Sequence, residues 1–329
     1  MTMKELAQMA GVSASAVSRY LNGGSLGREK RERIRQAIEK TGYQPDVAAQ
    51  MLRTGSTDYI GLIVPKLEST ALTRFTSGVT NTLTDAGYLV LLAETSGETE
   101  KELNYLSLLQ NRQVAGIIML AATLTPQLED ELRDVTVPIV VAGQRFRHIP
   151  CVYHDDYGAA YDLTDKILEE KDRKHIVYIG VTEQDVAVGL SRRKGVQGAM
   201  KEHGLDPESL HVEITSFSLE GGEAAMKRVL EQGIPFDAVV CATDRIAFGA
   251  LDVMKKAGLR VPEDVSLVGM DDYWAGEYIE PRLTTVHFYY KTCGEKSAQL
   301  LMEMIQNKGE SGPVHQITLG YTIRERDSI

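Results

Sequence analysis

The sequence contains few of the residues from which covalent or metal-based frameworks are built. Only three cysteines occur in 329 residues, and Cys151, Cys241 and Cys293 lie far apart in apolar or helical stretches. This spacing argues against a disulfide or zinc framework and favours reduced thiols in a cytoplasmic protein. The seven histidines are scattered singly, so we expect no metal site and no cofactor.

Long apolar runs and the common catalytic signatures are also missing. No run approaches the roughly 20 apolar residues that a membrane span needs, and no secretory signal precedes the first helical pattern. A P-loop and a GxSxG elbow are lacking, so an enzyme would depend on isolated acids. The candidates are Asp155, Asp156, Asp271 and Asp272. We therefore expect a cytoplasmic protein that is neither membrane-bound nor an enzyme.

The net charge of −10 is unevenly distributed. Residues 1–57 hold nine lysines and arginines against five acids, a balance of +4 that leaves −14 for residues 58–329. A basic N-terminal segment followed by an acidic remainder places a nucleic-acid-binding surface at the N-terminus.

The first residues have the pattern of two short helices. Apolar residues recur at helical spacing over Met3–Ala10, and Gly11 ends the pattern. Ser13 is expected to cap a second helix whose inner face includes Val17 and Leu21. This arrangement predicts a helix-turn-helix, for which a solvated helical hairpin is the alternative.

The outer face of the second helix is polar. Ser15, Ser18, Arg19 and Asn22 share this face, and Ala14 opens the helix. A short helix that presents hydroxyls and a guanidinium suits the major groove of DNA. Residues 28–41 predict a third helix with an inner stripe of isoleucine and alanine, completing a headpiece over residues 1–45.

Residues 46–57 are expected to be a hinge helix and linker. The helical segment, Asp46–Arg53, has about eight residues, too few for a stable free helix, so it would fold only against a partner. Leu52 is apolar with nothing nearby in the sequence to bury it. A wedge into the minor groove is one interpretation, and a plain interdomain linker is the other.

From residue 60 onwards, short apolar strands alternate with helices. Strands are predicted at residues 60–64, 89–93, 116–120, 138–142, 176–180, 212–216, 238–242, 265–269 and 283–286. Helices are predicted at residues 71–86, 98–111, 127–133, 159–170, 193–202, 222–232, 245–257 and 291–307. This alternation predicts an α/β core, and the number of units favours two doubly wound parallel-sheet lobes. Ligands bind at the carboxyl ends of such strands.

Motifs along the chain resemble those of the LacI/GalR family of bacterial transcriptional repressors. They are AGVS at residues 10–13, VSR at 17–19, GYQP at 42–45, AAQMLR at 48–53, IGLI at 60–63, TD at 243–244, VGMDD at 268–272 and LTTV at 283–286. Their order and spacing are specific and cover essentially the full length. The resemblance implies a homodimer, or a dimer of dimers, with a periplasmic-binding-protein-like core.

The resemblance also implies how the core is divided. The N-terminal lobe would comprise about residues 58–153 and 290–312, and the C-terminal lobe about residues 154–287 and 313–329. The chain would cross between the lobes near Tyr153–His154, Thr285–Phe288 and Pro313–Gln316.

By the same resemblance, the start of the second helix reads DNA. Ala14, Ser15 and Arg19 correspond to base-reading positions, and Ser13 and Asn22 to phosphate contacts. Leu52, beside the basic Arg53, corresponds to an intercalating leucine. With Ser18 on the same outer face, these are the expected DNA-binding residues.

The effector would bind between the lobes. The resemblance makes Asp271 an acceptor and Arg192 a donor for sugar hydroxyls. The further expected effector-binding residues are Lys66, Ser69, Tyr153, Phe217, Thr243 and Trp274. Three alternatives stay open: a helix cap for Asp271, rim packing for Trp274, and a sugar-phosphate contact for Lys66. For Asp244 we favour a helix cap.

Two positions depart from the family pattern. Phe288 replaces a commonly polar residue, and Gly143 stands where an acid can occur. Leu190 replaces the second base of the trehalose-type repressors, which weakens the sugar-phosphate hypothesis. Effector identity is therefore open.

The sequence thus predicts a repressor whose partners are double-stranded operator DNA, a small sugar or sugar phosphate, and a second copy of the chain. A regulator that depends on a corepressor or a partner protein is the alternative within the family. A transport-type sugar-binding protein would lack the headpiece.

Overall fold

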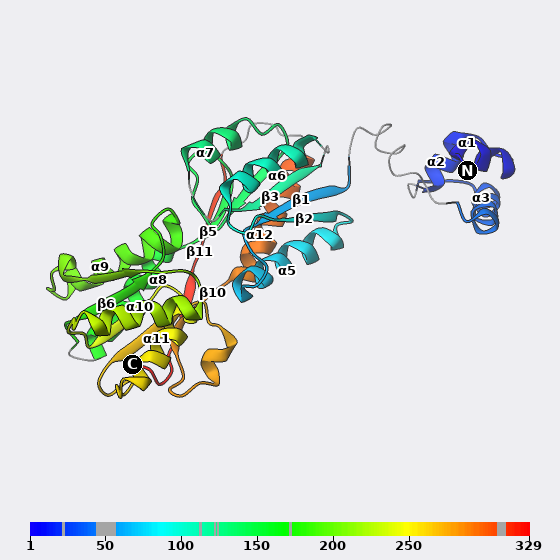
Figure 1. Cartoon of the computed structure of the whole chain (residues 1–329). Helices are drawn as coiled ribbons and strands as arrows, with labels where there is room; N and C mark the ends of the chain where they lie inside the picture. The colour runs from blue at the N-terminus through cyan, green and yellow to red at the C-terminus, as the bar shows by residue number, and fades with distance from the viewer. Residues whose placement is uncertain are drawn as a thin grey trace. The chain divides into compact units, whose positions relative to one another are not determined.

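The computed structural model describes residues 1–21, 24–43, 57–111, 114–121, 123, 125–170, 173–307 and 314–329. Contacts divide the chain between Thr57 and Asp58 into two units, a headpiece and a core, which are described separately (Figure 1). Asn22 and the expected hinge helix, with Leu52 and Arg53, lie outside the described residues.

The headpiece is a three-helix unit made of α1 (Met3–Met9), α2 (Ala14–Leu21) and α3 (Arg28–Thr41). Leu6, Val17 and Ile34 contribute one fully buried side chain from each helix to a common core. The Ser13 hydroxyl accepts a hydrogen bond from the Ala16 N–H at 3.2 Å, which confirms the predicted cap of α2. Gly42 ends α3 with φ 63°, a conformation that glycine adopts without strain.

The N-terminal lobe of the core contains a six-stranded sheet in the order β11-β5-β4-β3-β1-β2, with every described pairing parallel. Its strands are β1 (Tyr59–Val64), β2 (Leu89–Glu94), β3 (Gly116–Leu120), β4 (Ile139–Ala142), β5 (Cys151–His154) and β11 (Gln316–Leu319). Its helices are α5 (Thr70–Asp85), α6 (Thr99–Asn111), α7 (Pro126–Arg133) and α12 (Tyr290–Gln306).

The C-terminal lobe contains a second six-stranded sheet in the order β12-β10-β9-β8-β6-β7. Its strands are β6 (Ile176–Gly180), β7 (His211–Ile214), β8 (Ala238–Cys241), β9 (Ser266–Met270), β10 (Thr284–Phe288) and β12 (Tyr321–Arg324). Its helices are α8 (Asp156–Glu170), α9 (Arg192–Glu202), α10 (Leu219–Glu231) and α11 (Asp244–Lys256). A π-helical turn, Val186–Ser191, precedes α9, and two 3₁₀ turns lie at Pro207–Ser209 and Trp274–Glu277. The predicted α/β architecture is confirmed, but β12 is antiparallel to β10.

The lobe boundaries differ in places from the expected ones. The chain leaves β5 at His154, leaves β10 at Phe288 and changes lobes a third time at Gly320, between β11 and β12. The expected third crossing at Pro313–Gln316 is wrong, because Gln316 already pairs with Cys151 in the N-terminal sheet. His154 likewise belongs to the N-terminal lobe, since it pairs with Leu319.

Two glycines bring α5 and α12 of the N-terminal lobe close together. A Cβ at Gly78 would lie 2.1 Å from the Lys291 carbonyl oxygen, and a Cβ at Gly294 would lie 2.2 Å from that of Phe75. Only glycine fits at such an approach, so the start of α12 is held firmly against α5.

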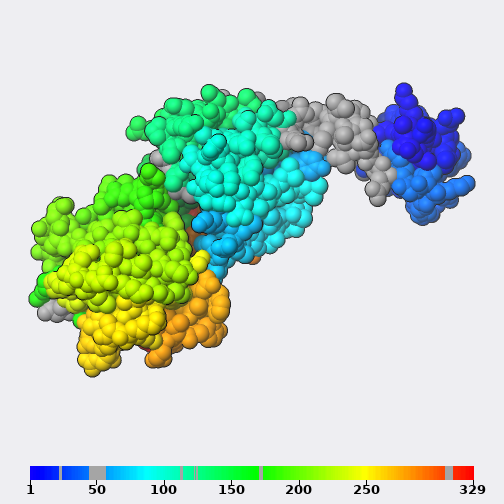
Figure 2. Space-filling view, viewed as in Figure 1, coloured from blue at the N-terminus to red at the C-terminus, as the bar shows by residue number. Residues whose placement is uncertain are grey.

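Figure 2 shows the lobes of the core as two masses, cyan to teal and green to orange. In the described part of the chain, no helix is long and apolar enough to span a membrane.

Candidate functional site

The exposed face of α2 carries most of the expected DNA-binding residues. Ser13, Ser15 and Arg19 are exposed, while Ala14 and Ser18 are half-buried. The hydroxyls of Ser13 and Ser15 lie 2.8 Å apart, so they form one polar group at the start of α2. This face can offer hydroxyls, a methyl group and a guanidinium to a DNA groove.

Two arginines of the headpiece form ion pairs within their own helix. On α3, Arg33 pairs with Glu29 and Arg35 pairs with both Glu32 and Glu39, each at 2.5 Å. Glu29 and Arg33 are four residues apart, the spacing that places two side chains next to each other on one helix face. Pairs of this kind stabilise the helix rather than bind phosphate.

In the core, the carboxyl ends of the strands of the two lobes face each other. Hydrogen bonds that involve Asp271, Asp272 and Asp185 cross between the lobes there. Tyr290 donates to Oδ1 of Asp271 at 2.6 Å, Arg74 donates to the Asp272 carbonyl at 3.5 Å, and Gln144 donates to Oδ1 of Asp185 at 2.8 Å. The expected effector-binding residues Arg192, Thr243 and Asp271 lie at the facing edge of the C-terminal lobe, and we call the region between the two edges the interlobe cleft.

Arg192, the first residue of α9, is the central cation of the cleft and is only 2% exposed. Its Nε donates to Oδ1 of Asp156 at 2.7 Å, and its Nη1 donates to the Ala242 carbonyl at 2.5 Å. The guanidinium carbon lies 4.6 Å from the centroid of the Phe288 ring. Burial lowers the pKa of Arg192, but Asp156, Tyr290 and Asp271 together raise it above its ordinary value, so the side chain stays protonated.

Asp271 is the cleft carboxylate that keeps an open side. Its Oδ1 lies 3.8 Å from Nη1 of Arg192, and its side chain retains 22% exposure. Burial raises the pKa of Asp271 to about 6, against the opposing effects of Arg192 and the Tyr290 hydroxyl. Its backbone has φ 136°, a strained conformation of the kind found at ligand sites.

Asp244 is not the helix cap that the sequence favoured. Thr243 caps α11 by accepting from the Ile246 N–H, so Asp244 falls one position inside the helix. Its fully buried carboxylate accepts from the Thr285 hydroxyl at 2.5 Å and from the Tyr273 N–H at 2.7 Å. Burial, with the nearby charge of Asp271, raises the pKa of Asp244 to about 7.

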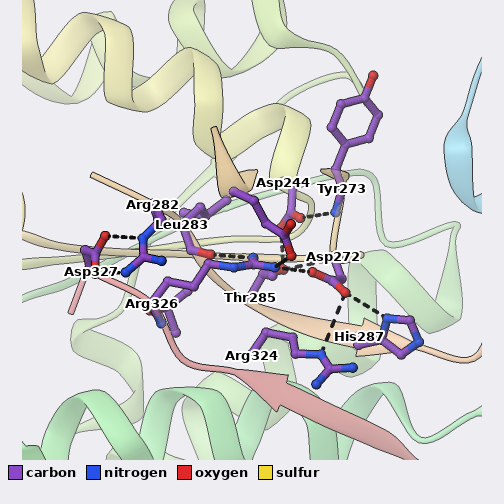
Figure 3. A network of polar contacts seen from close by, with 12 residues as sticks. Asp244, Asp272, Tyr273, Arg282, Leu283, Thr285, His287, Arg324, Arg326 and Asp327 are labelled. Carbon is purple, nitrogen blue, oxygen red and sulfur yellow. Dashed lines mark hydrogen bonds and ion pairs between the residues drawn. The ribbon is translucent and has the colours of Figure 1, made fainter. Parts of the chain in front are cut away.

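Asp272 fixes the loop that carries Asp271 (Figure 3). Its carboxylate accepts from Arg326 at 2.6 Å and lies 2.9 Å from Nδ1 of His287. Although burial raises the pKa of Asp272, the hydrogen bonds from Arg326 and His287 lower it below its ordinary value. The C-terminal segment thereby holds the loop after β9 in place.

The other expected effector-binding residues lie around the edge of the cleft. Phe217 follows β7 and is 45% exposed, and Trp274 is 59% exposed. Trp274 stacks on Tyr273 with ring centroids 5.7 Å apart, so rim packing and ligand stacking are both compatible with its position. Lys66 is exposed and Ser69 is half-buried, both between β1 and α5, and Tyr153 is half-buried in β5.

The sequence did not single out several residues of the cleft. Tyr290, Gln144 and Asp185 were missed, and Asp156 was noted only as an isolated acid. His154 was also missed as a site residue; it is buried, and its Nε2 lacks a hydrogen-bond partner in the described structure. Burial lowers the pKa of His154 to about 4. The position of Asp156, between a strand and a helix, was the one available signal.

A helix-turn-helix headpiece joined to a two-lobed core with a polar cleft defines a DNA-binding regulator with a small-molecule-binding domain. Residues 2–46 match the bacterial regulatory proteins of the lacI family, and residues 57–325 match the periplasmic binding proteins and sugar binding domain of the LacI family. The chain therefore belongs to the LacI family.

Individual relatives agree with this assignment along the whole chain. The sucrose operon repressor of Staphylococcus xylosus is 30% identical over 92% of this chain and 93% of its own length. The transcriptional repressor PurR of Pasteurella multocida is 31% identical over 98% of both chains.

Solved structures share the fold. A complex of the transcriptional regulator CelR with cellobiose has a TM-score of 0.76 and 27% identity, covering 100% of this chain and 99% of the other. The lac repressor dimer bound to operator has a TM-score of 0.89 at 22% identity, with 100% and 98% coverage.

Proposed function

We propose that this LacI-family regulator is a cytoplasmic homodimeric repressor, without enzymatic activity, that a small carbohydrate controls through the interlobe cleft. It would govern genes for the uptake or catabolism of that sugar. The sucrose operon repressor and the CelR–cellobiose complex among its relatives favour a disaccharide.

The observation that carries the proposal is the juxtaposition of Arg192 and Asp271, 3.8 Å apart, at the edge of the C-terminal lobe that faces the N-terminal lobe. A guanidinium donates and a carboxylate accepts, so the pair can hold adjacent hydroxyls of one sugar ring. Asp271 keeps an exposed side, whereas Arg192 is already positioned by Asp156. The edge of the cleft offers Phe217 and Trp274 as apolar surfaces for a sugar face.

A short series of contacts connects Asp271 in the C-terminal lobe to the helices of the N-terminal lobe. Asp271 accepts from Tyr290, which begins α12, and the two close-packing glycines hold α12 against α5. A ligand that rearranges Asp271 therefore shifts the N-terminal lobes of a dimer relative to each other. A coupling of about 1–3 kcal/mol would change operator affinity roughly 5- to 150-fold.

The DNA side of the proposal rests on α2 and on the expected hinge. Ser13, Ala14, Ser15, Ser18, Arg19 and Asn22 would contact the major groove and its phosphates, while Leu52 would enter the minor groove beside Arg53. We expect Leu52→Ala to weaken operator binding. Unchanged affinity in that variant would contradict the minor-groove wedge.

The test is fluorescence anisotropy of labelled DNA from the protein's own promoter region at fixed salt. Titrations with sucrose, cellobiose, trehalose and the 6-phosphates of disaccharides would follow. Release by one sugar supports the proposal, and loss of that effect in Asp271→Asn would place the sugar in the cleft. Tighter binding with a ligand would make the protein a corepressor system. Failure to bind DNA specifically would contradict the proposal.

Lys66 provides a separate test of the ligand's charge. It lies exposed in the loop after β1, on the cleft side of the N-terminal lobe. If a sugar phosphate is the effector, Lys66→Ala should weaken its binding and leave the uncharged sugar unaffected. Equal affinity of the variant for the best sugar phosphate would exclude this role.

A further inference from the structure

Gln144 is a buried amide at the junction of the two lobes. It follows β4 of the N-terminal lobe, where Gly143 turns the chain with φ 79°, and it is only 3% exposed. A glutamine so deeply buried in a loop needs hydrogen-bond partners, because an unpaired buried amide is costly.

The partners of Gln144 lie in the C-terminal lobe. Its Nε2 donates to Oδ1 of Asp185 at 2.8 Å, and its Oε1 accepts from the Ala187 N–H at 3.1 Å. The same Asp185 oxygen accepts from the Val188 N–H at 2.9 Å. Asp185 and Gln144 therefore cap the same turn together, one from each lobe, and satisfy N–H groups that a helix start leaves open.

The turn that they cap leads directly to the central cation of the cleft. In the π-helical turn Val186–Ser191, the Leu190 N–H donates to the Asp185 carbonyl at 3.1 Å. Gly189 packs so closely that a Cβ would lie 2.1 Å from the Thr182 carbonyl oxygen. Arg192 is the next residue after this turn, so the geometry of the turn sets the direction from which the guanidinium enters the cleft.

We propose that Gln144 is a positioning residue that latches the lobes together and thereby holds the π-helical turn and Arg192 in their cleft geometry. The contact can exist only while the end of β4 and the segment after β6 are close, so opening of the lobes removes half of the cap. This inference rests on the proposed function, because it gives Arg192 its role, and it identifies the contact that couples lobe closure to the ligand-binding arginine.

The test measures lobe separation without DNA or effector. Spin labels at Glu100→Cys in α6 and Glu208→Cys in the C-terminal lobe report the distance between the lobes by double electron–electron resonance. The three native cysteines are buried, so labelling can be directed to these two exposed sites. Gln144→Ala should lower the ratio of closed to open molecules by about 10- to 150-fold, the usual effect of losing a hydrogen bond to a charged group.

A second measurement follows Arg192 itself. Its Nε–H resonance should be protected from exchange in the parent protein, and it should shift and lose protection in Gln144→Ala. Asp185→Asn keeps an oxygen that accepts from Gln144 and should retain both the closed distance and the protected resonance. Arg145→Ala is the matched control, because Arg145 is exposed and donates to Gln316 within its own lobe.

An unchanged distance distribution in Gln144→Ala would overturn the inference, as would a longer distance with the Arg192 resonance unmoved. In that second case Gln144 would join the lobes without positioning the arginine. Failure of operator binding would overturn the proposed function alone, because both measurements here are made on the free protein.

Discussion

The hydroxyl of Tyr290 donates to Oδ1 of Asp271 at 2.6 Å, joining the first residue of α12 in the N-terminal lobe to the loop after β9 in the C-terminal lobe. This bond favours the charged form of Asp271 and so lowers its pKa against the larger effect of burial.

Tyr290→Phe should therefore raise the pKa of Asp271 above its present value of about 6. Near neutral pH, a smaller fraction of Asp271 would then be ionised to accept sugar hydroxyls. Carbon-13 NMR titration of the aspartate carboxyl groups measures the shift. Tyr289→Phe is the control, because the Tyr289 hydroxyl contacts Thr322 at 2.7 Å and not Asp271. Equal Asp271 titration curves in the two variants would show that the bond has no such effect.

The sequence predicted β1 to β4 and β6 to β10 but missed β5, β11 and β12. Each of these has four residues, and polar or half-buried positions such as Tyr153 and Gln316 interrupt the apolar signal. Their pairing partners are distant in sequence: β11 pairs with β5 and β12 with β10. Local propensity cannot report such pairings, which is why the third crossing was misplaced.

In the cleft, the sequence found Arg192 and Asp271 through a family resemblance but not the residues that position them. The cap of α11 was misassigned by one residue, because Thr243 and Asp244 are both suitable caps. The π-helical turn before Arg192 gave no signal, since its geometry depends on Gln144 from the other lobe. A contact between lobes is not encoded in the local pattern of either one.

The buried pair Arg192–Asp156 predicts a large effect on stability. Asp156→Ala removes the carboxylate and leaves the guanidinium buried, so we expect a loss of about 3 kcal/mol in the free energy of unfolding. Replacing both residues with apolar ones, Arg192→Met with Asp156→Leu, should recover most of this loss. Urea denaturation measures both effects. In the exposed pair Arg282–Asp327, solvent screens the charges, so Asp327→Ala should cost much less stability than Asp156→Ala. Similar losses from Asp156→Ala and Asp327→Ala would contradict the prediction.

The buried carboxylate of Asp244 predicts a specific pH dependence. Its pKa of about 7 in the folded protein lies above the ordinary 3.8. Between these pH values the Asp244 carboxyl is therefore protonated in the folded state and ionised in the unfolded state. Asp244 therefore contributes its full stability below about pH 4 and loses it as the pH rises to about 7, with a slope of at most about 1.4 kcal/mol per pH unit.

Asp244→Asn removes this titration, so its free energy of unfolding should fall less than that of the parent between pH 4 and pH 7. Urea denaturation at several pH values tests the difference. Asp327 supplies a contrasting control, because its hydrogen bond from Arg282 lowers its pKa. Its contribution is present above the ordinary pKa and is lost on acidification. Parallel pH profiles for Asp244→Asn and the parent would rule out the role of Asp244.

The exposed leucines of the edge strand β2 indicate where the interface of the proposed dimer lies. Leu89, Leu91 and Leu92 are 60%, 40% and 41% exposed on a strand that pairs only with β1 among the described strands. Exposed apolar residues on a sheet edge are typical of a surface that another chain covers. Leu91→Asp should convert the proposed dimer to a monomer in sedimentation equilibrium. Leu108→Asp on α6 changes an equally exposed leucine (45%) and should leave the dimer intact. A dimer that survives Leu91→Asp would place the interface elsewhere.

Arg19 predicts how the headpiece reads its operator. It is exposed on α2, beside the linked hydroxyls of Ser13 and Ser15, and its guanidinium can pair with a guanine in the major groove. Arg19→Ala should weaken binding to the best operator by about 1–3 kcal/mol, roughly 5- to 150-fold, and should relax the preference at one base pair. Arg35→Ala is the matched control, because Arg35 is held by Glu32 and Glu39 on α3. Anisotropy titrations against operators with single base changes separate the two variants. If Arg19→Ala lowers affinity for every sequence equally, Arg19 contacts phosphate and does not read a base.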